Sequence, residues 1–146
     1  MFWCYHCYAV NDHPSGPCDA CGQPVQAPID LSYTGGLIWA LRHPDGDRAV
    51  VAARTLGRLK NRESARALRE AAQAGADIYL RAEALRSLIA IEGAAPLRPL
   101  LEELARDAPF NVRDIARRAL RNQQPANGPD ASVVDVPARD LQRERR

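Results

Sequence analysis

The chain has 146 residues, of which 20 are Lys or Arg and 18 are Asp or Glu, so its formal net charge is only +2. This balance excludes a polybasic, histone-like protein and a chain dominated by an acidic solvating tail. A hydrophobic fraction of 46% is typical of a globular domain, and an aromatic fraction of only 5%, with abundant Ala, Leu and Arg, favours helices over a β-sandwich or barrel.

Charge and helix-breaking residues divide the chain into three blocks. Residues 1–31 carry three acids and no Lys or Arg, residues 32–124 carry 16 basic and 11 acidic residues, and residues 125–146 carry four of each. Prolines mark the first boundary, and Pro, Gly and Asn together mark the second. The predicted organisation is a small module at 1–28, a helical domain at 32–122 and a disordered C-terminal tail at 123–146. Within the tail, a strand-like docking motif at Val133–Val136 is the alternative.

The first block contains all four cysteines of the chain, as two Cys-x2-Cys pairs separated by ten residues. The pairs are Cys4 with Cys7 and Cys18 with Cys21. Each pair can present two thiolates from one tight turn, and two such turns supply the four soft ligands that tetrahedral Zn²⁺ prefers. Because about 25 residues cannot bury a sufficient core, a metal staple is expected. We predict one structural zinc ion with no open coordination position for catalysis.

The segment from Cys4 to Gly22 resembles the zinc-ribbon, or rubredoxin-knuckle, family, which implies these same four ligands. It departs from the family at Tyr8, where many such knuckles have glycine. An iron site of the rubredoxin type is the alternative metal centre, although its spacer is usually much longer. Two disulfides, a thioredoxin-like redox motif, or replacement of one cysteine ligand by His6 or His13 are further alternatives. The absence of a secretory signal and of a βαβ pattern disfavours the disulfide and redox interpretations.

The middle block repeats with an offset of 32 residues. A small and a large apolar residue four positions apart recur in three segments, and such pairs form one face of a helix. The pairs are Ala52 and Leu56, Ala84 and Leu88, and Ala116 and Leu120. Partner helices lie between these segments, and Asp77 and Asn111 are predicted N-caps. Three helix pairs at a fixed short period predict an all-α fold, a short α-solenoid behind the small metal-binding module.

The repeat strings are Leu-Arg-x-x-Ala-x-x-x-Leu at residues 80–88 and Val-Arg-x-x-Ala-x-x-Ala-Leu at residues 112–120. They resemble HEAT repeats, specifically the short HEAT-like repeats of the phycobilisome-lyase type. The first repeat departs from them, since Ala49 replaces the motif arginine. The resemblance implies a scaffold for protein binding, and some relatives handle tetrapyrrole chromophores or bind DNA through residues outside the motif. The motif arginines Arg81 and Arg113 are predicted to be structural.

Three arginines occupy one position in three successive repeats: Arg54, Arg86 and Arg118. Arg58 and Arg121 flank them. Since adjacent parallel helices pack about 8–10 Å apart, these residues are predicted to form a stripe across the second helices of the pairs. Such a stripe suits an acidic peptide, carboxylates or phosphates. An ordinary solvated helix face is the alternative interpretation.

The short first repeat is predicted to expose an apolar end, which the ribbon would cap through Leu37, Ile38 and Trp39. No catalytic triad, phosphate-binding loop or dinucleotide motif is readable, so an enzyme is not expected. We expect a zinc-containing adaptor that binds a protein partner, with a nucleic-acid binder as the alternative and a chromophore lyase less favoured. Since no apolar run reaches about 18 residues and no signal peptide is recognisable, we expect a cytoplasmic protein without a membrane span.

Overall fold

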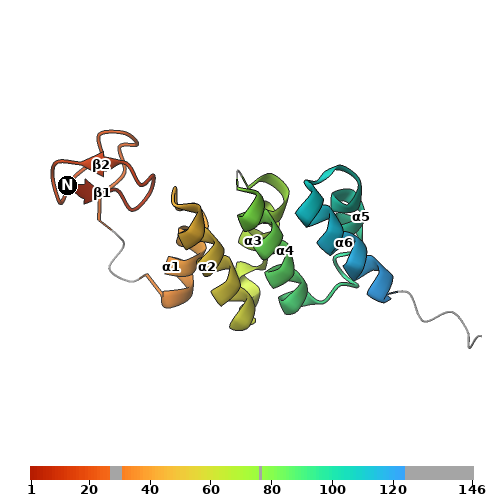
Figure 1. The fold of residues 1–146 in the computed structure, drawn as a ribbon. Helices are drawn as coiled ribbons and strands as arrows, with labels where there is room; N and C mark the ends of the chain where they lie inside the picture. The colour runs from red at the N-terminus through yellow and green to blue at the C-terminus, as the bar shows by residue number, and fades with distance from the viewer. Residues whose placement is uncertain (27–30, 76, 124–146) are drawn as a thin grey trace, which may run out of the picture.

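The computed structural model describes residues 1–26, 31–75 and 77–123, so the predicted tail lies outside the described residues from position 124 onward. Two short strands precede the helices (Figure 1). The elements are β1 (Phe2–Trp3), β2 (Val10–Asn11), α1 (Tyr33–Ala40), α2 (Gly46–Arg58), the 3-10 turn η1 (Arg62–Ser64), α3 (Ala65–Ala74), α4 (Ile78–Glu92), α5 (Arg98–Asp107) and α6 (Phe110–Gln123). The prediction of an all-α solenoid of three helix pairs behind a small cysteine-bearing module is confirmed.

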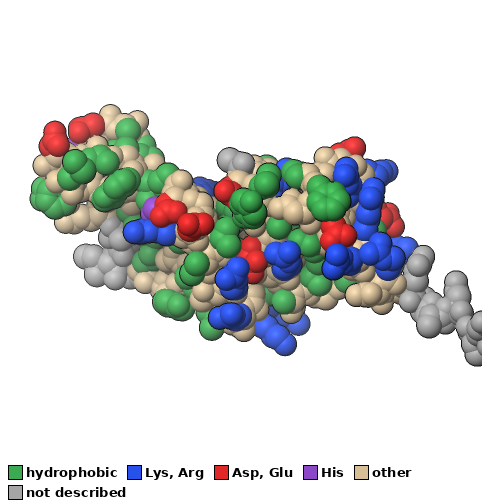
Figure 2. Space-filling view, viewed as in Figure 1, with side chains coloured by type: hydrophobic (Ala, Val, Ile, Leu, Met, Phe, Trp, Pro, Cys, Tyr) green, Lys and Arg blue, Asp and Glu red, His purple; other side chains and the backbone are tan. Residues whose placement is uncertain are grey.

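The helices pair in chain order, α1 with α2, α3 with α4 and α5 with α6. The second helices α2, α4 and α6 lie side by side in one row, and α4 contacts both of its neighbours (Figure 1). Figure 2 shows that Lys and Arg side chains gather on the face that these second helices present. In the part of the chain that the structure describes, we find no helix whose length and apolarity would suffice to cross a bilayer.

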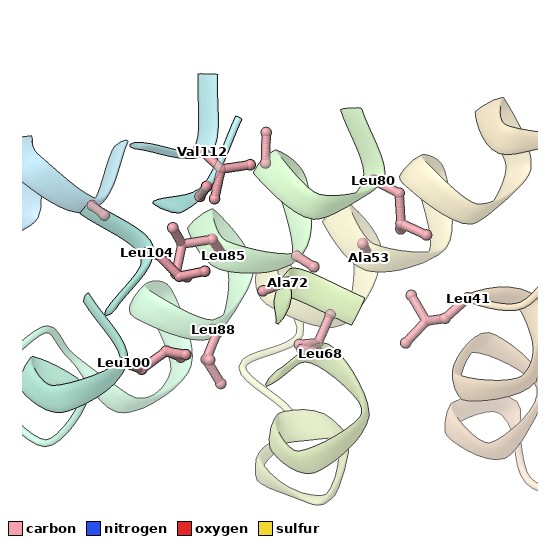
Figure 3. Packing of buried hydrophobic residues seen from close by; sticks show 14 of the residues in the cluster. Leu41, Ala53, Leu68, Ala72, Leu80, Leu85, Leu88, Leu100, Leu104 and Val112 are labelled. Carbon is pink, nitrogen blue, oxygen red and sulfur yellow. The ribbon is translucent and has the colours of Figure 1, made fainter. Parts of the chain in front are cut away.

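A single hydrophobic core runs along the solenoid between the helices (Figure 3). Its largest fully buried side chains include Leu56 of α2, Leu68 of α3, Leu88 of α4 and Leu101 of α5. Burying each of these leucines contributes about 1.5–3 kcal/mol. The predicted repeat positions are therefore core positions, and only Leu120 is left half-buried, on α6, the last helix of the described residues.

The two predicted helix caps have different outcomes. The Oδ1 of Asp77 accepts hydrogen bonds from the backbone N–H groups of Tyr79 and Leu80 at 2.7 and 2.9 Å, which confirms it as the N-cap of α4. Asn111 instead lies inside α6, so its predicted capping role is wrong. Its Nδ2 donates to the carbonyl oxygen of Ile78 at 3.0 Å and joins the beginnings of α4 and α6.

Helix α1 is the most weakly held of the six. It has eight residues, none of them buried, and it contains the consecutive glycines Gly35 and Gly36, which disfavour helix. Its N-terminus is capped by Ser32, whose Oγ accepts from the N–H of Gly35 at 3.0 Å. Helix α1 packs mainly on α2, and its other tertiary contacts include the N-terminal cysteine-bearing module, residues 1–26, called the ribbon below.

Candidate metal centre and helical face

The two Cys-x2-Cys turns have matching backbone hydrogen bonds. The N–H of Tyr8 donates to the carbonyl of Cys4 at 2.9 Å, and the N–H of Gly22 donates to the carbonyl of Cys18 at 2.9 Å. In each turn the N–H two residues after the first cysteine also points at its sulfur, with N···Sγ distances of 3.3 Å at Cys4 and 3.4 Å at Cys18. Amide groups directed at sulfur stabilise a thiolate, so both turns are shaped to present charged ligands.

The four sulfur atoms lie together, all within 4.8 Å of one another. The Sγ–Sγ distance is 3.7 Å both between Cys4 and Cys21 and between Cys7 and Cys18. A disulfide requires about 2.05 Å, and all four cysteines are free. A tetrahedral centre with metal–sulfur bonds of about 2.3 Å has sulfur–sulfur edges of about 3.8 Å. The cluster therefore fits one tetrahedral metal ion, with Zn²⁺ and iron equally compatible in size.

Neither alternative histidine ligand joins this cluster, which among the described residues consists of the four cysteines alone. The His6 ring packs edge-on against Trp39, with centroids 4.9 Å apart. The Nδ1 of His13 lies 2.8 Å from the carbonyl oxygen of Ser15, and its Nε2 lies 3.4 Å from Oδ1 of Asp19. The two histidines thus serve the ribbon's packing and its spacer loop.

Thiol ionisation in the cluster is strongly uneven. Burial opposes ionisation of Cys18, but the N–H groups of Ala20 and Cys21 and the side chain of Asn11 outweigh it and lower the pKa of Cys18 to about 6. At Cys21 the N–H of Gln23 favours the thiolate, but burial and the neighbouring sulfurs raise its pKa to about 12. Four thiolates so close together repel one another, and a divalent cation would remove that repulsion.

Asn11 supports the centre, although the sequence carried no signal for it. The residue is 2% exposed, its Nδ2 donates to the carbonyl of Ala9 at 3.0 Å, and its Oδ1 accepts from the N–H of Asp19 at 3.0 Å. These bonds tie the first turn to the second. A lone asparagine in a short polar segment has no spacing pattern that could reveal this role.

The ribbon contacts the helical domain through aromatic side chains. The Tyr5 ring lies 4.8 Å from the Trp39 ring, and the Tyr8 ring lies 4.6 Å from the His43 ring, measured between centroids. The Oη of Tyr8 also donates to the carbonyl oxygen of Trp39 at 3.2 Å. Of the three residues predicted to receive the ribbon, only Trp39 makes these contacts. Leu37 and Ile38 pack against the solenoid core instead.

Tyr8 occupies a backbone conformation that normally requires glycine. Its φ is 60°, and the equivalent position of the second turn is Gly22, with φ of 71°. The left-handed conformation costs a side-chain-bearing residue about 1–2 kcal/mol. Burial raises the pKa of Tyr8, so its hydroxyl remains a protonated donor to Trp39. The tyrosine at this position makes a contact with the helices that glycine could not make.

Replacing Tyr8 with glycine should separate these two effects. We expect Y8G to bind metal as tightly as the wild type, since backbone strain is relieved, while the helices lose about 1–2 kcal/mol of stability. Y8F, which removes only the hydroxyl, should lose about half as much. Chelator competition measures metal affinity, and thermal circular dichroism measures the helices. Unchanged helix melting in Y8G would show that the ribbon and the helices are independent.

The structure places the predicted arginine stripe on three neighbouring helices. Arg54 lies on α2 and Arg86 on α4, and both pair with the carboxylate of Glu83, at N···O distances of 3.2 and 3.3 Å. Arg118 on α6 pairs with Asp114 at 2.9 Å. The carboxylates of Glu83 and Asp114 therefore neutralise part of the positive charge of the stripe. The recurrence of arginine at one repeat position could not reveal these acidic partners.

The arginines that flank the stripe, Arg58 and Arg121, differ in their surroundings from the motif arginine Arg81. Arg58 and Arg121 are exposed, and within the described residues neither takes part in an ion pair. Arg81 is half-buried, and its Nε donates to the carbonyl oxygen of Ala72 at 3.0 Å, which confirms its predicted structural role. Arg58 and Arg121 thus add exposed positive charge beside the stripe.

A family model for HEAT repeats matches residues 35–121, more than half of the chain. The chain therefore belongs to the HEAT-repeat family, in agreement with its three helix pairs and 32-residue offset. No curated protein and no solved structure matches it. HEAT repeats commonly mediate protein–protein interaction, and membership of this family therefore suggests a scaffold role for the helical domain.

Proposed function

We propose that this protein is a non-enzymatic, zinc-binding adaptor of the cytoplasm that binds a protein partner through the face of α2, α4 and α6. One observation carries the proposal: Arg54, Arg86 and Arg118 stand at one repeat position on three neighbouring second helices. Cations in a row on a rigid scaffold favour an acidic partner, because they steer its approach and can form charge-assisted hydrogen bonds with its carboxylates.

The zinc ribbon serves this adaptor as a structural module. Four thiolates at tetrahedral spacing give a closed coordination sphere, which supports zinc in a structural role. Its contacts with Trp39 support a second role as cover for the weakly held α1. Metal analysis of purified protein tests the choice of ion, since an iron–thiolate centre is coloured and a zinc centre is colourless.

A nucleic-acid binder is the second candidate, because the exposed charge of the helical face is predominantly positive. The acidic ribbon counts against this function, as it carries no Lys or Arg. The two candidates differ in salt dependence, since binding to nucleic acid weakens steeply as salt rises. A chromophore-lyase activity of the phycobilisome-lyase type is the least favoured proposal.

Affinity capture from native lysate tests the adaptor. We expect the wild type to retain a protein partner after nuclease treatment, and a variant with Arg54, Arg86 and Arg118 all changed to Glu to lose it. A matched variant carries the same reversal at the exposed residues Arg66, Arg98 and Arg106 of α3 and α5. This control should keep the partner. If the captured material is nucleic acid that nuclease removes, the nucleic-acid binder is supported. If the wild type, the stripe variant and the control variant all capture the partner equally, the binding site lies outside the stripe.

A further inference from the structure

Two grooves cross the helical face on either side of α4, and they share Arg86. The first, of about 410 Å³, lies between α2 and α4. The second, of about 490 Å³, lies between α4 and α6. Since one arginine borders both, a partner segment lying across α4 would contact both grooves at once.

The first groove is suited to carboxylates. Its walls carry Arg54, Arg58, Lys60 and Arg86 against the single carboxylate of Glu83, and small residues form the rest of its lining. The Glu83 side chain is 13% exposed and is already shared by two of the arginines. The Glu83 carboxylate therefore shows that this groove accommodates a carboxylate beside arginine. The other two cations of the lining, Arg58 and Lys60, are exposed to solvent.

The second groove has an apolar floor. Four partly buried side chains that pack against the solenoid core form it: Ile89, Ala94, Ile115 and Ala119. Arg86 and Arg118 stand at its sides together with Asp114, whose carboxylate already pairs with Arg118 at 2.9 Å and leaves Arg86 as the second cation of this groove. Its wall also includes Gln123, whose Nε2 is buried with no acceptor among the described residues. An apolar side chain of a partner would be removed from water on this floor. Carboxylates next to it in the partner's sequence would lie beside Arg86.

We propose that these grooves bind an acidic segment of a partner protein in which an apolar side chain adjoins carboxylates. The carboxylates lie between α2 and α4, and the apolar side chain lies on the floor between α4 and α6. Charge complementarity and the order of the two grooves argue for this occupant, because nucleic acid offers no aliphatic side chain for the second groove. The proposal rests on the proposed function and names the chemistry of its partner.

Fluorescence anisotropy with labelled synthetic peptides tests this chemistry on the metal-loaded chain of 146 residues. The probe has a Glu-Glu-Gly-Leu-Glu core, and companion probes replace leucine with serine or every glutamate with lysine. We expect the leucine probe to bind at least about fivefold more tightly than the serine probe, and the lysine probe not to bind. A labelled single-stranded DNA should bind more weakly than the leucine probe.

Variants with opposite expected effects separate recognition from stability. R86E should weaken probe binding by more than about tenfold, while E83Q, which frees two arginines, should strengthen it about threefold. A119Q, which fills the apolar floor, should remove the preference for leucine. R66E on α3 is the matched control and should bind as the wild type. Circular dichroism establishes that each variant is folded.

The proposal is overturned if the leucine and serine probes bind alike, if R86E binds as the control does, or if the DNA binds more tightly than the leucine probe. Failure of the peptides with continued capture of a protein by the wild type, and its loss in the stripe variant, would overturn this binding mode and leave the adaptor function standing. Failure of both experiments would overturn the adaptor function as well.

Discussion

Replacing Cys18 and Cys21 with serine is expected to unfold the ribbon and also to lower the melting temperature of the helices. Among the described residues, the ribbon's own buried hydrophobic cluster consists of Cys4, Cys18 and Val25, two of which belong to the cysteine cluster. Such a small core cannot offset the conformational entropy of ordering the segment. Binding of a structural zinc ion releases about 10–16 kcal/mol in small zinc peptides, which is the scale that this module needs.

The effect on the helices follows from the aromatic contacts. Once the ribbon unfolds, Trp39 loses the packing of Tyr5 and His6 and the hydrogen bond from Tyr8. These contacts are worth about 1–2 kcal/mol together, and α1 has no buried residue to replace them. We expect the helical melting temperature to fall by about 4–16 °C, since each kcal/mol corresponds to about 4–8 °C in a domain of this size.

Thermal circular dichroism and metal analysis of the same samples measure this result. A variant with Asp12 and Gln26, both exposed in the ribbon, changed to serine is the control and should melt as the wild type. Chelation of the wild-type protein should reproduce the effect of the cysteine variant. If the metal is lost but the helices melt at an unchanged temperature, the ribbon does not stabilise α1 and its capping role is wrong.

The sequence was most informative where function or packing imposes a spacing. The Cys-x2-Cys pairs predicted the cluster, and the recurring pairs such as Ala84 with Leu88 predicted the buried faces, because sulfur geometry and the helical period both translate directly into residue intervals. Glu83 and His43 could not be assigned roles in this way. Each acts through a partner distant in the chain, and a single residue without a recurring interval does not indicate which distant residue it will meet.

The close packing between α2 and α4 is another feature that no recurring residue spacing in the sequence could predict. Gly57 is buried in α2, and a Cβ added there would lie 2.6 Å from Oγ, 2.7 Å from Cβ and 2.9 Å from Cα of Ser87. Real Cβ atoms essentially never approach other atoms so closely. Since one of these neighbours is backbone, a change of side-chain rotamer cannot relieve the clash. The glycine therefore permits the close approach of the two helices that carry Arg54 and Glu83.

We expect G57A to destabilise the protein by about 1–3 kcal/mol, although alanine is intrinsically the better helix former by about 1 kcal/mol. The helices must separate, and the Arg54–Glu83 pair should lengthen with them. G36A is the matched control, because among the described residues a Cβ there meets Leu31 alone, at an ordinary contact distance of 3.8 Å, and alanine should stabilise α1.

Chemical denaturation of G57A, G36A and the wild type measures the free energies of unfolding. Adding S87G to G57A should recover part of the loss, because it removes the two side-chain atoms of Ser87 but leaves the Cα. Higher stability in G57A than in the wild type would mean that helix propensity outweighs packing here, and that α2 and α4 have room to separate. A loss in G57A beside a gain in G36A would establish that inter-helix distance, rather than propensity, decides where this solenoid requires glycine.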